Sequence, residues 1–101
     1  MQINYAKKFQ KAFLKLDKKH REKVLSTIQI FQENPLSQIL RNHTLKGSML
    51  GKRAISVTGD LRIIFEEHQG YTLVLMLDVG THNNVYWNIH NLNRIWKRWI
   101  W

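Results

Sequence analysis

Cysteine is absent from this chain of 101 residues, proline occurs once, and only seven residues are acidic. Without cysteine the chain has no disulfide, no thiolate metal site and no cysteine nucleophile. A protein without disulfides fits a reducing compartment, so we expect a cytoplasmic location. The longest apolar run, Leu73 to Leu77, is too short to cross a bilayer, and the first residues show no secretory signal. We therefore expect one small domain without a membrane span.

Positive charge is the feature that the chain has in excess. Sixteen Lys and Arg residues against seven Asp and Glu give a net charge of +9, and eight of the cations fall between Lys7 and Lys23. Such a surplus favours a polyanionic or acidic partner, nucleic acid above all. A solvated helix face is the alternative reading of the same run of charge.

Hydrophobic spacing predicts a short strand and then two helices in the first third of the chain. Residues 2–6 alternate weakly, as a strand does. Two sets of apolar residues then recur at helical spacing: Phe9, Ala12, Phe13 and Leu16, followed by Val24, Leu25, Ile28 and Phe31. Asp17 is a suitable N-cap for the second helix, and Asn34-Pro35 ends it. The short connection predicts an antiparallel helix hairpin.

The rest of the pattern predicts a loop and then an antiparallel meander. Residues 36–50 show no period, and three alternating or apolar stretches follow at 52–57, 61–67 and 71–79, separated by Thr58-Gly59 and Gln69-Gly70. Gly80 is expected to end the last strand, whose two apolar faces are typical of a central strand. The order of elements predicts an α+β fold in two layers, with both helices on one face of the sheet.

Several polar residues lie in predicted loops and at strand ends, where sites are usually built. They are His43, Arg53, Asp60, Arg62, His82 and Tyr86. Each also has an ordinary structural reading: a histidine can cap a turn, an aspartate can close one, and an arginine can pair across the surface. Metal binding by His43, His82 and His90 is disfavoured because their spacing matches no known ligand pattern.

As a group, these residues suit the metal-free cleavage of RNA by its own 2′-hydroxyl. Histidine, with an ordinary pKa of about 6.5, serves as a base or an acid near neutrality. Arginine offers a planar fork of donors to the phosphate charge that grows in the transition state. An aromatic ring can stack on a base that is turned out of the strand. DNA lacks the attacking hydroxyl, so this chemistry selects RNA.

Three segments carry distinctive motifs in one order along the chain: 41–47 (RNHTLKG), 57–65 (VTGDLRIIF) and 78–86 (DVGTHNNVY). Together with the helix hairpin, they resemble the RelE/ParE toxin superfamily, and especially its YafQ-like branch, over residues 1–87. Residues 1–87 are therefore expected to form the toxin domain, with 88–101 as a C-terminal extension.

The resemblance implies a toxin of a type II toxin–antitoxin module that cleaves mRNA, usually on the ribosome, without a metal or cofactor. It also implies a cognate antitoxin as partner, with operator DNA contacted only through the toxin–antitoxin complex. Two alternatives stay open: a ParE-like toxin that inhibits DNA gyrase without ribonuclease residues, and a degenerate toxin that acts only as a binding module.

By motif position, the resemblance assigns His43 and His82 as catalytic histidines and Asp60 as the acidic residue. Arg62 corresponds to the strand arginine that stabilises phosphate, and Tyr86 to the terminal aromatic position. Six basic residues are expected to bind RNA: Lys18, Lys19, Arg21, Lys46, Lys52 and Arg53.

Two positions depart from the family pattern. Ser56 stands where the YafQ-like branch often has a further histidine, and Ile55 stands where RelE-like members are basic. The chain thus combines two styles of active site, and the sequence leaves open which histidine is the acid and which is the base.

The C-terminal extension 88–101 is basic and rich in tryptophan, and its apolar residues recur near helical spacing. Three readings stay open: a helix on a membrane surface, a helix docked on the body or on a second copy, and a stretch without function. The docked helix is the favoured reading, because ordered chain ends are usually held by contacts.

Overall fold

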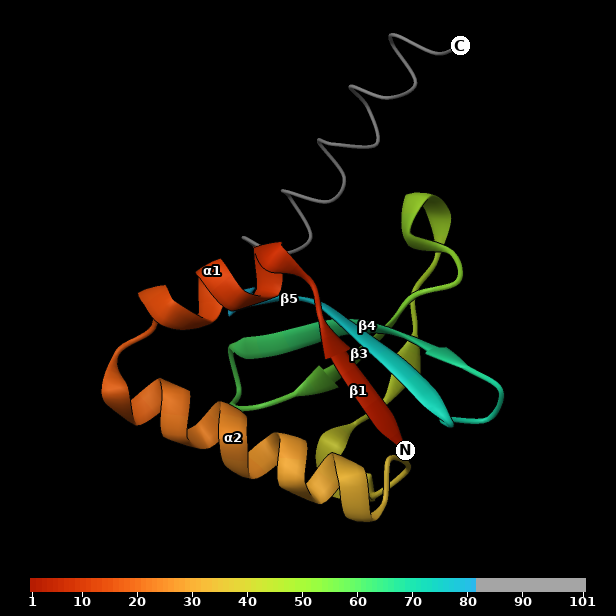
Figure 1. The fold of residues 1–101 in the computed structure, drawn as a ribbon, viewed down its shortest axis with the longest axis horizontal. Coiled ribbons are helices and arrows are strands. Elements are labelled where there is room, and N and C mark those ends of the chain that lie inside the picture. The colour runs from red at the N-terminus through yellow and green to blue at the C-terminus, as the bar shows by residue number, and fades with distance from the viewer. Residues whose placement is uncertain (82–101) are drawn as a thin grey trace, which may run out of the picture.

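A five-stranded sheet covered on one face by two helices forms the body of the protein (Figure 1). The computed structural model describes residues 1–81. Its elements are β1 (Gln2–Tyr5), α1 (Lys7–Lys15), α2 (Lys18–Glu33), the short 3₁₀ turn η1 (Gln38–Leu40), β2 (His43–Thr44), a second 3₁₀ turn η2 (Gly47–Met49), β3 (Arg53–Ser56), β4 (Leu61–His68) and β5 (Leu73–Thr81). The predicted two-layer α+β fold is confirmed.

The strands lie in the order β1-β5-β4-β3-β2. β1 pairs with β5 in parallel, and every other pair is antiparallel. The helix hairpin connects β1 to the meander and returns the chain across the sheet. The prediction that the last strand is interior is confirmed, because β5 lies between β1 and β4. In the described part of the chain, no helix is long and apolar enough to cross a membrane.

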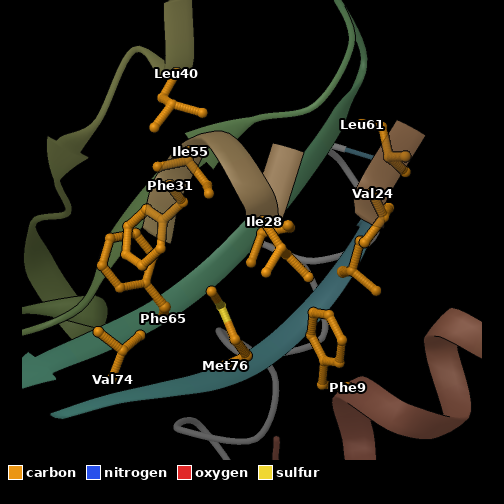
Figure 2. Packing of buried hydrophobic residues seen from close by; sticks show 12 residues of the cluster. Phe9, Val24, Ile28, Phe31, Leu40, Ile55, Leu61, Phe65, Val74 and Met76 are labelled. Carbon is orange, nitrogen blue, oxygen red and sulfur yellow. The ribbon is translucent and has the colours of Figure 1, made fainter. Parts of the chain in front are cut away.

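The helices form where the apolar spacing predicted them, and Asp17 caps α2 by accepting a hydrogen bond from the His20 backbone at 2.8 Å. Their apolar stripes cover one face of the sheet and bury the main core. Figure 2 shows Phe31 lying against Phe65, with ring centroids 5.0 Å apart in an edge-to-face arrangement. This core fixes the position of the sheet under the hairpin.

β3 and β5 begin one and two residues later than predicted, and two further differences from the expectation bear on the site. Residues 43–44 form strand β2, although the sequence predicted a loop there, because His43 and Thr44 pair with Ala54 and Arg53 of β3. β5 continues past Gly80 to Thr81, which pairs with Leu61, so the prediction that Gly80 ends the strand is wrong. Both differences arise from pairing with a distant strand, and local spacing does not encode it.

Candidate active site

The sheet has two unlike faces, and the alternation of its buried residues identifies them. Ile55 and Ile63 belong to the main core beneath the helices. Ala54 and Ile64 belong to a second, smaller cluster with Leu45 and Met49. Since successive residues of a strand point to opposite faces, this second cluster lies on the face away from the helices. We call that side the open face.

His43 and Arg62 both belong to the open face. His43 is paired with Ala54, and Arg62 is two residues from Ile64 on β4. Directly paired residues of antiparallel strands share a face, and so do residues two apart on one strand. Two strand spacings and two residue steps place the Cα atoms of His43 and Arg62 about 12 Å apart. Their side chains are long enough to approach one small group from both sides.

A backbone hydrogen bond fixes the protonation pattern of the His43 ring. Nδ1 lies 2.8 Å from the carbonyl oxygen of Arg41, and the side chain is exposed. Because a carbonyl oxygen can only accept, Nδ1 carries the hydrogen and donates it. In the neutral ring the lone pair is therefore on Nε2. His43 thus presents a proton acceptor on the open face of the sheet.

Arg62 is half-buried and held by the turn between β3 and β4. Its Nη1 donates to the carbonyl oxygens of Thr58 at 2.7 Å and Leu61 at 3.3 Å. Both of these bonds use one nitrogen, so Nε and Nη2 have no hydrogen bond to a residue in the range 1–81. The strand neighbours of Arg62 are Ser56 and Gly80, which leave space around it. The guanidinium is oriented by the turn and can still receive an anion.

Asp60 lies in the same turn and is exposed. The Thr58 hydroxyl accepts hydrogen bonds from the backbone of Asp60 at 3.3 Å and of Leu61 at 3.0 Å, which fixes the shape of the turn. β5 ends beside this turn, at the Thr81–Leu61 pair. The predicted site residues His82 and Tyr86 lie outside the described residues, as do His90 and the extension 88–101.

Arg53, which was predicted to bind RNA, takes part in a hydrogen-bond network behind the site. Its Nε donates to Asn42 Oδ1 at 2.8 Å. Asn42 Nδ2 in turn donates to the Pro35 carbonyl and to the Tyr71 hydroxyl, both at 2.9 Å. This single amide joins the segment after α2, strand β3 and the turn before β5. It thereby holds the chain immediately before His43.

The other predicted RNA-binding residues fall into two groups. Lys18 and Lys19 in the first turn of α2, and Lys46 before η2, are exposed. Arg21 instead donates to the Leu16 carbonyl at 2.8 Å, and Lys52 Nζ lies 3.9 Å from Glu66 Oε1. The exposed lysines are available to phosphate groups without breaking a contact. For all six residues, RNA binding stays a prediction.

Sequence reasoning missed Arg41, although it begins the RNHTLKG motif. The structure places Arg41 after η1, exposed, and beside the same turn as Arg62. Its position next to His43 in the motif was the available signal. Within residues 1–81, no three His, Cys, Asp or Glu side chains are grouped so that they could hold a metal ion.

Comparisons with solved structures define the class of protein. YafQ from E. coli strain BL21(DE3) is 24% identical, with a TM-score of 0.72 over 84% of this chain and 97% of that chain. YafQ in the E. coli DinJ-YafQ toxin-antitoxin complex is 27% identical, with a TM-score of 0.66 over 84% and 96%. The archaeal RelE-RelB complex from Pyrococcus horikoshii OT3 matches with 20% identity and a TM-score of 0.64 over 79% and 92%. The chain therefore has the fold of RelE-like toxins.

The family follows from the sequence itself. The family model described as "Bacterial toxin of type II toxin-antitoxin system, YafQ" matches residues 1–87. The chain belongs to this family, and the resemblance inferred from the three motifs is confirmed. No curated protein matches the sequence.

Proposed function

We propose that this toxin is a metal-independent endoribonuclease that cleaves mRNA on the ribosome. The observation that supports this proposal is the placement of a proton acceptor, His43 Nε2, and a phosphate-binding fork, Arg62, on one open face of the sheet. A ligand that contacts both side chains must offer a removable proton to His43 and an anionic group to Arg62. A ribose 2′-hydroxyl next to its phosphate has both.

The cleavage proceeds as an in-line displacement within the RNA. His43 removes the proton of the 2′-hydroxyl, and the 2′-oxygen forms a bond to the adjacent phosphorus. The bond from phosphorus to the 5′-oxygen breaks, and an acid protonates the leaving oxygen. The products are a 2′,3′-cyclic phosphate and a 5′-hydroxyl. Arg62 stabilises the charge on the non-bridging phosphate oxygens during the reaction.

The acid is assigned to His82, which follows Thr81 directly in the sequence. The motif of 78–86 supports this role, and so does the end of β5 beside the turn that carries Asp60 and leads into Arg62 on β4. The Asp60 carboxylate accepts no hydrogen bond from another described residue, so it is available to orient the acid. Tyr86 would stack on a base next to the cleaved bond.

Ribosomes programmed with mRNA test the proposal. We expect the wild-type protein to cut the mRNA, and His43→Gln to lower the cleavage rate by about 10²-fold or more. Arg62→Ala should lower it at least as much, and Arg62→Lys should remain impaired because lysine cannot form the planar fork. Lys23→Ala, on the exposed side of α2, is the matched control. Intact mRNA combined with inhibited DNA supercoiling would overturn the proposal in favour of a ParE-like toxin.

We further propose a cognate antitoxin as partner, which contacts the groove between α1 and α2. This apolar groove has a volume of about 560 Å³ and includes Leu14 and Leu25, whose side chains are 71% and 57% exposed. Lys7 and Lys11 stand three residues before Gln10 and Leu14, so lysines border its apolar surface. An amphipathic antitoxin segment with acidic flanks would match both the apolar and the basic features.

Leu14→Glu should weaken the toxin–antitoxin complex, because it places a like charge against the acidic flanks and removes apolar contact. Titration calorimetry with the purified antitoxin measures the change, which we expect to be at least tenfold in the dissociation constant. Lys23→Gln, which lowers the net charge by the same single unit, serves as the control on the same hairpin. Unchanged antitoxin affinity in Leu14→Glu would place the interface elsewhere.

A further inference from the structure

A hollow next to the candidate site shares only Arg62 with the cleavage reaction described above. Its volume is about 210 Å³, and it lies between the end of η1 and the turn that connects β3 to β4. Two of its lining side chains are cationic, and two others are apolar. The lining residues are Ile39, Arg41, Ser56, Val57, Thr58, Gly59 and Arg62.

Arg41 is held in an uncommon backbone conformation at the mouth of this hollow. Its φ is 50°, in the left-handed region, and its backbone N–H donates to the Gln38 carbonyl at 3.2 Å. Its carbonyl oxygen accepts the hydrogen bond from His43 Nδ1. A non-glycine residue keeps this conformation only when its surroundings fix it. The backbone of Arg41 is therefore positioned together with the proposed base.

The guanidinium of Arg41 has no partner among the described residues, although its backbone is fixed. The side chain is exposed, and within residues 1–81 it forms no hydrogen bond or ion pair. Arg62 lines the same hollow, its Nε and Nη2 form no hydrogen bond to a residue in the range 1–81, and none of the described lining residues is acidic. Two cations that face one small space repel each other unless an anion lies between them. The hollow is thus suited to a phosphate group.

The apolar lining residues limit the kinds of ligand that suit the hollow. Ile39 is 69% exposed, and with the partly buried Val57 it borders the space near the arginines. A free inorganic anion would gain nothing from such a surface. A nucleotide would, because its ribose and base have apolar faces that can cover Ile39 while its phosphate binds the guanidinium groups.

We propose that this hollow is a subsite for the nucleotide that adjoins the cleaved bond, with Arg41 binding its phosphate and Ile39 contacting its ribose or base. The subsite rests on the proposed ribonuclease function, since it places an RNA strand across His43 and Arg62. Arg41 is a substrate-binding residue and takes no part in proton transfer. It sets how tightly a single-stranded RNA is held and how the strand is aligned.

Binding of a hexaribonucleotide with 2′-O-methyl groups tests the subsite, because this RNA cannot be cleaved. Arg41→Gln should raise its dissociation constant at least fivefold in fluorescence anisotropy. It should also reduce the slope of log affinity against log salt by about 0.7, the value for one phosphate contact in a single strand. Arg41→Lys should lie between Arg41→Gln and wild type. Lys23→Gln, the matched control, should stay within twofold of wild type.

Two further readouts separate binding from cleavage. On cleavable RNA, Arg41→Gln should raise KM and leave kcat within about threefold of wild type. In methyl NMR spectra, the Ile39 signal should shift when the 2′-O-methyl RNA is added to the wild-type protein. An unshifted Ile39 signal, or wild-type RNA affinity in Arg41→Gln, would overturn the subsite even if mRNA is cleaved. An Ile39 shift and weakened binding without any cleavage would support the subsite and reject the ribonuclease.

Discussion

At the scale of single residues, hydrogen bonds rather than apolar packing fix the groups proposed to act on RNA. The Arg41 carbonyl selects the His43 tautomer, and the Thr58 carbonyl orients Arg62. Asn42 stands between Arg41 and His43 in the chain. Its amide uses both its donor and its acceptor groups to join three separate segments. Leu40 is buried in the main core, but Arg41 and His43 are exposed, so the Asn42 amide is the contact that holds the chain between them.

Asn42→Ala should destabilise the protein by about 2 kcal/mol, because partners such as Tyr71 and Arg53 lose their hydrogen bonds in a half-buried place. Urea denaturation measures the loss. Asn4→Ala, in the exposed strand β1, is the matched control and should change stability by about 0.5 kcal/mol at most. Equal stabilities of the two variants would show that the amide network does not hold this segment.

At the scale of elements, the sequence predicted what depends on local spacing and capping. Both helices, the Asp17 cap and the meander follow from apolar periods and turn residues near one another in the chain. Strand β2 has only two residues, and it exists because β3 pairs with it. No local period reveals such a strand.

The sequence predicted only part of the candidate site, because the rest depends on pairing between strands that are distant in the chain. The motif resemblance singled out His43 and Arg62, but only the register through β3 shows that they share the open face. Arg53 was chosen for its charge, and its bond to Asn42 depends on a fold contact that the sequence does not display. The role of Arg41 depends on a left-handed backbone, and the sequence contains no glycine there to signal it.

Helix α1 is attached to β5 partly through an ion pair whose effect on stability depends on pH. Lys8 Nζ lies 3.4 Å from Asp78 Oδ2, and the carboxylate is buried. Burial raises the pKa of Asp78, and the Lys8 charge opposes this rise. The folded state therefore holds the Asp78 proton more tightly than the unfolded chain does. Ionisation of Asp78 consequently lowers stability as the pH rises from about 4 through the folded-state pKa.

Lys8→Met should therefore cost more stability at neutral pH than in acid. We expect a loss of about 1–2 kcal/mol at pH 7, because Lys8 Nζ is buried beside the Asp78 carboxylate although the Lys8 side chain as a whole is 39% exposed. The loss should shrink near pH 4, where Asp78 is protonated. Thermal unfolding across this pH range measures both values. Lys11→Met, one turn along α1, is the control, and a pH-independent loss in Lys8→Met would exclude the ion pair as its cause.

At the scale of the whole molecule, the net charge of +9 acts in opposite directions on folding and on RNA binding. The excess positive charges repel one another in the folded state. Added salt screens this repulsion and should therefore raise Tm. The same charge attracts RNA by releasing counterions, so added salt should weaken binding.

Raising the salt from about 50 to 300 mM should weaken the binding of an uncleavable RNA about 100-fold if roughly four phosphates are engaged. Calorimetry and fluorescence anisotropy on the same samples measure Tm and affinity together. The double variant Lys18→Gln/Lys19→Gln removes two exposed lysines of α2. In this variant, both Tm and RNA affinity should depend less on salt than in the wild type. If Tm rises with salt while RNA affinity stays constant, the positive surface does not bind RNA.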